Sequence, residues 1–394
     1  MFSGMKRFIY RHRRKIVIGG LFSGAMYALY RLATRRLLKW QEEEMKELLE
    51  YSIRKEHFEK NERTCNQTIL SLSSSLYNKI EELFDTKMIV SNLKSGVAED
   101  KIALWEELKI IAFARLATLV YAGAMIVIML RTQLNIIGGY IYCESKINSN
   151  GCTDSPVTIS NEHQEQYLSS CQHFLTVGIE ELSSLIEKKV RLVLENESLK
   201  KPLSLPDIER YFWAIQSSIS SDVKNPIKNL STFVLASSST GQPTDIVPYN
   251  EPLLKNLWEE TIDLISSSEV RSLGTSCVSR GFSQVMDRIS EFVIPPRESS
   301  GDTAITQAVP STSAACQKLL SSVTQTSVPN GTIVSINKST IPMAKLIPII
   351  NGMSGSSACD QWMQDFINMR NLKVYGANVY EAFCCNTNVR FDNR

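Results

Sequence analysis

The residue types that most often carry out acid–base chemistry are scattered along this chain. His12 lies in a basic cluster, His57 lies on a charged helical stretch, and His163 and His173 fall ten residues apart with no set of carboxylates shared between them. These surroundings are typical of surface or packing histidines rather than catalytic ones. The neighbouring acids at 42–44 and 106–107 are typical of solvated helix faces. The sequence therefore offers no catalytic residue.

Motifs that would bind a cofactor or a metal ion are also absent. The chain has no G-x-x-x-x-G-K-[ST] phosphate loop, no G-x-G-x-x-G, no H-E-x-x-H and no G-x-S-x-G. Its nine cysteines include no C-x-x-C pair, so neither a zinc site nor a disulfide framework is indicated. We therefore expect a protein that is not an enzyme and that carries no cofactor.

A binding role is indicated by the helical stretch that begins just after residue 100. Lys101, Leu104, Trp105 and Leu108 have i, i+3, i+4 and i+7 spacing, so they share one helix face. Tryptophan is common at binding hot spots because it buries a large area at low entropic cost. This face could anchor a partner helix, or Trp105 could be an ordinary core residue.

The N-terminal segment is predicted to attach the chain to a membrane. Residues 16–30 are uncharged and mostly apolar, and residues 32 and 33 extend them, which gives a short anchor of residues 16–33. The alternatives are a cleaved signal peptide, which lacks a small-residue cleavage site here, and a surface helix, which would be apolar on one face only. The apolar anchor residues are Ile16, Val17, Ile18, Leu21, Phe22, Met26, Leu29 and Tyr30, and the basic flanks are Arg11, Arg13, Arg14, Lys15, Arg31, Arg35 and Arg36.

Charge is distributed unevenly between this segment and the rest of the chain. The first 39 residues hold ten Lys and Arg and no Asp or Glu, whereas the whole chain has a net charge of +2. The remaining residues are therefore net acidic, which argues against nucleic-acid binding. The basic end favours contact with anionic lipid.

A second apolar run, Leu116–Leu130, lies between Arg115 and Arg131. Its flanks are long helical patterns with charges on one side, which favours a buried core helix over a second membrane span. If the run did span, the chain would be a multi-spanning membrane protein, such as an insertion or transport protein. The sequence leaves this alternative open.

The fold class predicted from hydrophobic periodicity is all-α. Apolar residues at three- and four-residue steps predict long helices at about 42–84, 101–137 and 161–196, with a turn at 92–100 and a helix stop at Gly138-Gly139. Shorter helices are predicted at 205–218, 252–267, 269–293 and 359–385, the last interrupted near Asn371. We expect an elongated helical bundle of residues 41–394 behind an N-terminal region of residues 1–40. Two Ser-, Thr- and Pro-rich segments, about 220–250 and 295–342, are predicted to be flexible loops.

Several strings, in order, resemble one known family. They are FEKNERTCNQTILSL (58–72), KIALWEELKIIAFAR (101–115), LRTQLNIIGGYIY (130–142), QYLSSCQHFL (166–175), RGFSQVMDRISEF (280–292), MAKLIPIINGM (343–353) and ANVYEAF (377–383). The chain resembles the peroxisomal biogenesis factor 3, or peroxin-3, family over most of its length. The resemblance implies a peroxisomal membrane protein with a short N-terminal anchor, a cytosolic helical bundle and no enzymatic activity.

The resemblance also implies a partner and a site. Family members dock the import receptor peroxisomal biogenesis factor 19, which carries newly made membrane proteins, by holding its N-terminal amphipathic helix in an apolar groove. The family's groove residues correspond to Leu93, Lys101, Trp105 and Lys345 here, and a one-residue shift would move the first to Lys94. The lysines could instead be simply solvated. An organelle tether that binds inheritance or turnover adaptors through other faces is compatible with this reading.

Overall fold

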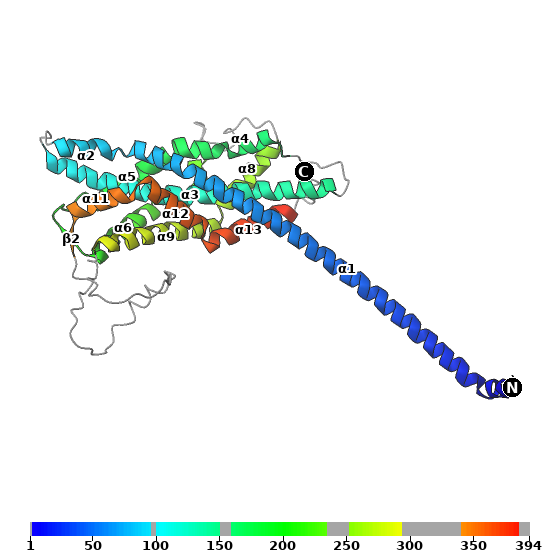
Figure 1. Ribbon diagram of the computed structural model, residues 1–394. Helices are drawn as coiled ribbons and strands as arrows, with labels where there is room; N and C mark the ends of the chain where they lie inside the picture. The colour runs from blue at the N-terminus through cyan, green and yellow to red at the C-terminus, as the bar shows by residue number, and fades with distance from the viewer. Residues whose placement is uncertain (1, 96–99, 150–158, 235–251, 294–339, 386–394) are drawn as a thin grey trace, which may run out of the picture. The chain divides into compact units, whose positions relative to one another are not determined.

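The computed structural model describes residues 2–95, 100–149, 159–234, 252–293 and 340–385, and for residues 2–23, 25, 147–149 and 385 it describes the backbone only (Figure 1). The chain divides into two compact units, residues 1–64 and 65–394. Nearly all described residues are helical, and the described strands are one two-residue antiparallel pair. The all-α prediction is therefore confirmed.

The first unit is helical from residue 2 onward, because helix α1 (Phe2–Leu83) begins there and continues into the second unit. Among the predicted anchor residues, Met26, Leu29 and Tyr30 are exposed, as are the basic residues Arg31, Arg35 and Arg36 that follow them. The side chains of the other anchor and flanking residues lie outside the described ones. A helix at this position suits the predicted anchor, which stays a prediction.

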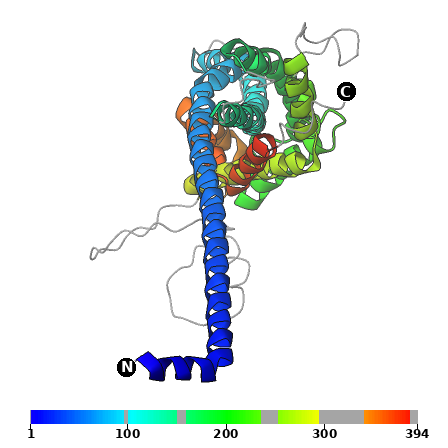
Figure 2. The same cartoon turned by 90° about the vertical axis from the view of Figure 1, so that its right-hand side faces the viewer.

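Helix α3 (Lys101–Ser149) is the central element of the second unit. Figure 2 shows it in the middle of the bundle, and its neighbours among the described residues include eight helices that pack along it. These helices are α2 (Thr86–Ser95), α4 (Asn161–His173), α5 (Ile179–Leu194), α8 (Pro252–Ile265), α9 (Ser268–Val293), α11 (Met343–Met353), α12 (Ser356–Ile367) and α13 (Arg370–Cys385). Helix α6 (Leu205–Ser220) packs on α5 and α9, and the short α7 (Leu230–Val234) packs beside α4, α5 and α8.

The apolar run Leu116–Leu130 lies in this central helix, and every one of its residues is buried. Within the described residues, α3 is the one helix long and apolar enough to cross a membrane, and 94% of its most apolar window is buried inside the protein. A segment surrounded by other helices needs no polar face, which explains why it is apolar all round. The buried-core prediction is confirmed.

The predicted helix stop at Gly138-Gly139 is wrong, because α3 continues to Ser149. A Cβ atom on Gly139 would lie 2.7 Å from the Cβ atom of Phe383 and 3.0 Å from the carbonyl carbon of the same residue. Glycine therefore serves the close approach of α13 to α3 at this position rather than chain termination. Residues 144–149 also belong to α3, and residues 150–158 lie outside the described ones.

The predicted turn at 92–100 is only partly present, because residues 92–95 complete helix α2. The Asp85 carboxylate starts this helix by accepting the backbone N–H of Lys87 at 2.9 Å, which interrupts α1 and lets a new helix begin. Residues 96–99 lie outside the described ones. Helix α2 was missed in the sequence because its ten residues are few for a periodic pattern.

The predicted helix 161–196 is present as α4 and α5, joined by a π-helical turn, η1 (Phe174–Gly178). The predicted loop at 220–250 also contains more structure than expected, since α7 packs against this turn. Residues 235–250 of that loop lie outside the described ones, as do residues 295–339 of the loop predicted at 295–342. The last described residues of the second loop form strand β2 (Ile341–Pro342), which pairs with β1 (Pro202–Leu203).

Substituting Gly178 by alanine is expected to destabilise the bundle by about 1–3 kcal/mol. Its Cβ atom would lie 2.2 Å from the carbonyl oxygen of Phe233 and 2.8 Å from the Cδ2 atom of Phe174, so α7 or η1 would have to move. The matched control is Gly352→Ala in α11, where nothing lies within 4 Å of the added atom. That control should be neutral or slightly stabilising in urea unfolding. Equal effects of the two substitutions would contradict the packing argument.

Two buried arginines on α3 join distant parts of the second unit. The Arg115 guanidinium donates to the hydroxyl of Tyr77 at 3.2 Å and to the carbonyl of Ser354 at 3.1 Å. The Arg131 guanidinium, fully buried, donates to the side-chain oxygen of Asn66 at 2.9 Å and to the carbonyl of Ile367 at 2.8 Å. Because buried carbonyl groups need partners, these arginines fix the ends of α11 and α12 against α1 and α3.

Candidate partner-binding site

The predicted site residues come from three elements that meet in the second unit. Leu93 lies on α2, Lys101, Leu104, Trp105 and Leu108 lie on the first turns of α3, and Lys345 lies on α11. Both α2 and α11 pack against α3, and Figure 1 shows the three elements at the same end of the bundle. We call Leu93, Lys101, Leu104, Trp105 and Lys345 together the candidate face.

The first turn of α3 is fixed by its N-terminal cap. The Asp100 carboxylate accepts the backbone N–H groups of Ile102 at 3.1 Å and Ala103 at 3.0 Å. These N–H groups have no partner inside the helix, so the cap stabilises the helix start. It thereby sets the direction of Lys101 and Trp105.

The apolar residues of the candidate face differ in depth. Leu93, Leu104 and Trp105 are half-buried, and Leu93 and Trp105 pack against the hydrophobic core while leaving part of each side chain accessible. Lys94 is exposed, so Leu93 is the residue of the two that packs against the body. Helical spacing predicted Leu108 on the binding face, and the structure corrects this prediction. Leu108 is 3% exposed and belongs to the core, because neighbouring helices already cover α3 one turn after Trp105. It supports the face from beneath.

The cations of the candidate face are available for a partner. Lys101 and Lys345 are exposed, and no ion pair or hydrogen bond of either side chain is found among the described residues. Lys87 on α2, by contrast, pairs with Glu81 at 3.0 Å. The face therefore combines half-buried apolar groups with positive charge that the described residues leave unpaired.

Sequence reasoning missed two exposed apolar residues on the elements that carry this face. Ile102, at the first turn of α3, is 71% exposed, and Met88 on α2 is 64% exposed. Ile102 precedes Trp105 by three residues, so helical spacing places the two side by side. That i, i+3 relation was the signal that could have identified Ile102.

The polar side of α3 is held by ion pairs just beyond the candidate face. Both carboxylate oxygens of Glu107 accept from the Arg191 guanidinium on α5, at 3.1 and 2.9 Å, and this pairing raises the pKa of Arg191. Lys109, whose side chain is fully buried, pairs with Glu106 and donates to the backbone carbonyl of Glu197 at 2.7 Å. A bidentate arginine pair gives directional specificity, so α3 has a fixed rotation about its axis.

The start of α11 is held by the segment that connects α5 to α6. The backbone N–H groups of Met343 and Ala344 donate to the carbonyls of Lys201 at 3.1 Å and Leu199 at 3.0 Å. Strands β1 and β2, which lead into α6 and α11, pair directly beside these bonds. The backbone position of Lys345 therefore depends on residues 199–203.

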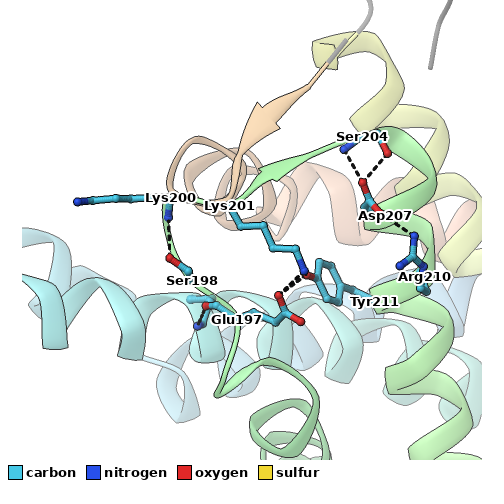
Figure 3. Close-up of polar contacts among 9 residues, drawn as sticks. Glu197, Ser198, Lys200, Lys201, Ser204, Asp207, Arg210 and Tyr211 are labelled. Carbon is cyan, nitrogen blue, oxygen red and sulfur yellow. Dashed lines mark hydrogen bonds and ion pairs between the residues drawn. The ribbon is translucent and has the colours of Figure 1, made fainter. Parts of the chain in front are cut away.

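Figure 3 shows the side chains that fix this connecting segment. The Lys201 ammonium lies between the Glu197 carboxylate, at 2.7 Å, and the Tyr211 hydroxyl, at 3.0 Å, while Lys200 extends away from them. Tyr211 also donates to Glu197 at 2.6 Å. The hydrogen bonds from Lys201 and Tyr211 lower the pKa of Glu197, and the same Glu197 contact raises the pKa of Lys201.

Residue types suited to catalysis are placed in structural roles. His163 caps α4, where its Nδ1 atom accepts the backbone N–H of Ser160 at 3.2 Å. Burial raises the pKa of the Cys277 and Cys359 thiols to about 12, which suits packing rather than nucleophilic attack. Among the described residues, no group of three or more His, Cys, Asp or Glu side chains is arranged to hold a metal ion.

Comparison with known proteins identifies the family. The family model described as Peroxin-3 matches residues 7–102 and 95–382. A Bos taurus protein named peroxisomal biogenesis factor 3 is 33% identical over 399 residues, which cover 97% of this chain and 98% of that protein. The chain belongs to the peroxin-3 family. The resemblance inferred from the sequence is thereby confirmed.

Other members of the peroxin-3 family match with different sequence identity and coverage. The Homo sapiens peroxisomal biogenesis factor 3 is 32% identical over 401 residues and covers 97% of this chain, and the Yarrowia lipolytica protein of that name is 23% identical over 359 residues and covers 72%. Membership of the peroxin-3 family supports a role in peroxisome membrane biogenesis and an association with peroxisomes. These proteins are named as biogenesis factors.

Proposed function

We propose that this chain is a docking receptor on the peroxisomal membrane that binds the N-terminal amphipathic helix of the import receptor peroxisomal biogenesis factor 19. The observation that carries the proposal is the candidate face, where half-buried Trp105 and Leu93 lie on α3 and α2, and the exposed Lys101 and Lys345 lie on α3 and α11. An amphipathic helix would bury its apolar side against the first pair, and acidic residues on its rim would meet the lysines. No step of this function needs a cofactor or a small-molecule substrate.

Direct binding tests the docking proposal. The full-length chain, kept in detergent micelles, is titrated calorimetrically with a synthetic peptide of the receptor's N-terminal helix. Saturable binding with a negative heat-capacity change is expected, because apolar surface is buried, and the affinity should fall as salt rises. A folded chain that does not bind the peptide would overturn the proposal.

The proposed attachment is a single anchor at residues 16–33, with the second unit facing the cytosol. The basic flanks on both sides of the anchor favour the anionic headgroups of the membrane surfaces. Membrane integration through this anchor leaves α3 free to be the core helix that the second unit requires, with 94% of its most apolar window buried. A multi-spanning arrangement would have to remove α3 from that core.

Deleting residues 1–40 is expected to release the chain from membranes. Alkaline carbonate extraction should leave the full-length chain in the membrane pellet and move the deletion variant to the supernatant, because the apolar stretch of about 18 residues that anchors the chain is gone. The released variant should still bind the receptor peptide. A deletion variant that stayed in the pellet while folded would contradict the single-anchor arrangement and support the multi-spanning alternative.

A further inference from the structure

A continuous series of hydrogen bonds connects the two halves of the candidate face. It begins on α3 at Lys109, one turn after Trp105, which donates to the backbone carbonyl of Glu197 at 2.7 Å. The Glu197 carboxylate then binds the Lys201 ammonium at 2.7 Å, and the Lys201 carbonyl accepts the backbone N–H of Met343 at 3.1 Å. Met343 is the first residue of α11 and lies two residues before Lys345.

We propose that Glu197, Lys201 and Tyr211 form a clasp that sets the position of Lys345 relative to Trp105. The inference rests on the proposed docking function and adds positioning residues to it. None of the three clasp residues belongs to the candidate face. They act through α11, whose start they hold against the residue 199–203 segment.

Three features of the clasp suit it to this task. Its members make mutual bonds, since Tyr211 contacts both Glu197 at 2.6 Å and Lys201 at 3.0 Å, so each side chain is held by two others (Figure 3). Tyr211 comes from the buried side of α6, 8% exposed, which gives the clasp a rigid base. The clasp is also the point where α3, through Lys109, and α11, through Met343, are bonded to the same five-residue stretch.

A positioning role should change affinity only through Lys345. A cation that meets an acidic group on a partner contributes when it is held near the optimal distance and contributes little when it is mobile. Loosening the clasp should therefore weaken the binding of an acidic helix when Lys345 is present. When Lys345 has been removed, loosening the clasp should have no further effect.

The test is a double-mutant cycle on the full-length chain in detergent micelles, with the receptor-helix peptide as the probe. Glu197→Gln keeps the backbone carbonyl that Lys109 binds and removes the charge that holds Lys201. We expect Glu197→Gln and Lys345→Ala each to weaken binding by about threefold to tenfold, and the double variant to bind like Lys345→Ala alone. The direction of the change in affinity is informative. Glu197→Gln makes the chain more positive, so it would strengthen binding to an acidic peptide if net charge alone mattered.

Asp207→Asn is the matched control. Asp207 caps α6 beside the clasp, where it accepts from Ser204 and Arg210, and its neutralisation changes the net charge by the same amount. It makes no bond to α11 among the described residues, so peptide affinity should be unchanged. If Glu197→Gln fails to fold, Tyr211→Phe serves instead, since it removes the hydroxyl and keeps the ring, and a loss of about twofold to threefold with the same dependence on Lys345 is expected.

The outcomes separate this inference from the function on which it rests. Wild-type affinity in Glu197→Gln, an equal loss in the Lys345→Ala background, or full affinity in Lys345→Ala would each overturn the clasp while docking stands. A wild-type chain that does not bind the peptide would overturn the docking function itself.

Discussion

Replacing Arg131 by methionine is expected to lower the free energy of unfolding of the bundle by about 3–5 kcal/mol. The side chain is fully buried, and its guanidinium donates to Asn66 and to the carbonyl of Ile367. Methionine fills part of the volume and donates no hydrogen bond, so both acceptors would be left buried without this partner. Urea unfolding followed by the fluorescence of the buried tryptophans Trp258 and Trp362 would measure the loss.

The control for Arg131→Met is Arg271→Met on the exposed side of α9. An exposed arginine in a helix contributes little, so the control should change stability by no more than about 0.5 kcal/mol. A loss below about 1 kcal/mol in Arg131→Met would show that the two acceptors find other partners. Arg131→Lys should give an intermediate loss, because an ammonium cannot reach both acceptors with the geometry of a guanidinium.

Replacing Trp105 by alanine is expected to weaken binding of the receptor helix by about 2–4 kcal/mol, which is a factor of about 30 to 1,000 in affinity. The indole is half-buried against the core, so it is already ordered before the partner arrives and costs little entropy on binding. The lysines of the candidate face cannot replace the apolar area of the indole. Calorimetric titration of the variant against the wild type measures the effect.

Trp213→Ala provides the comparison for Trp105→Ala. Trp213 lies on α6, is 67% exposed, and does not belong to the candidate face, so its removal should leave peptide affinity unchanged. Circular dichroism of both variants must show wild-type helix content. Unchanged binding in Trp105→Ala would make this residue a packing residue and would move the docking surface elsewhere.

Much of the helical architecture could be predicted because its signal is local. The periodic apolar positions of α5, α6, α8 and α9 predicted those helices, and the all-round apolar run in α3 predicted a buried segment. The errors arise where the local structure depends on a contact with a residue far away in the sequence. From the sequence alone, Gly139 is typical of a helix stop. In the structure it is needed because Phe383 packs closely against it, and these two residues are 244 positions apart in the chain. Helix α11 was not predicted, because it contains Pro348, which usually breaks a helix.

The residues of the candidate site could be predicted from the sequence, but how deeply each one is buried could not. Helical spacing placed Leu108 on the same face as Trp105, but spacing does not reveal where the neighbouring helices begin to cover α3. The burial of Leu108 depends on that coverage. The clasp could not have been predicted from sequence either, because Glu197, Lys201 and Tyr211 form no recognisable motif in the sequence. Their importance comes only from the contact between residues 199–201 and the start of α11.

The apolar middle of α3 has a consequence for the chain during its synthesis, before it folds. While it is being made, the chain exposes two stretches that a membrane-insertion machinery could accept, the N-terminal one and residues 116–130. Only the completed bundle hides the second stretch, and its partners α9, α11, α12 and α13 are synthesised last. The final topology therefore depends on whether the bundle folds before residues 116–130 insert into a membrane. A chaperone that holds the unfinished chain would favour folding of the bundle.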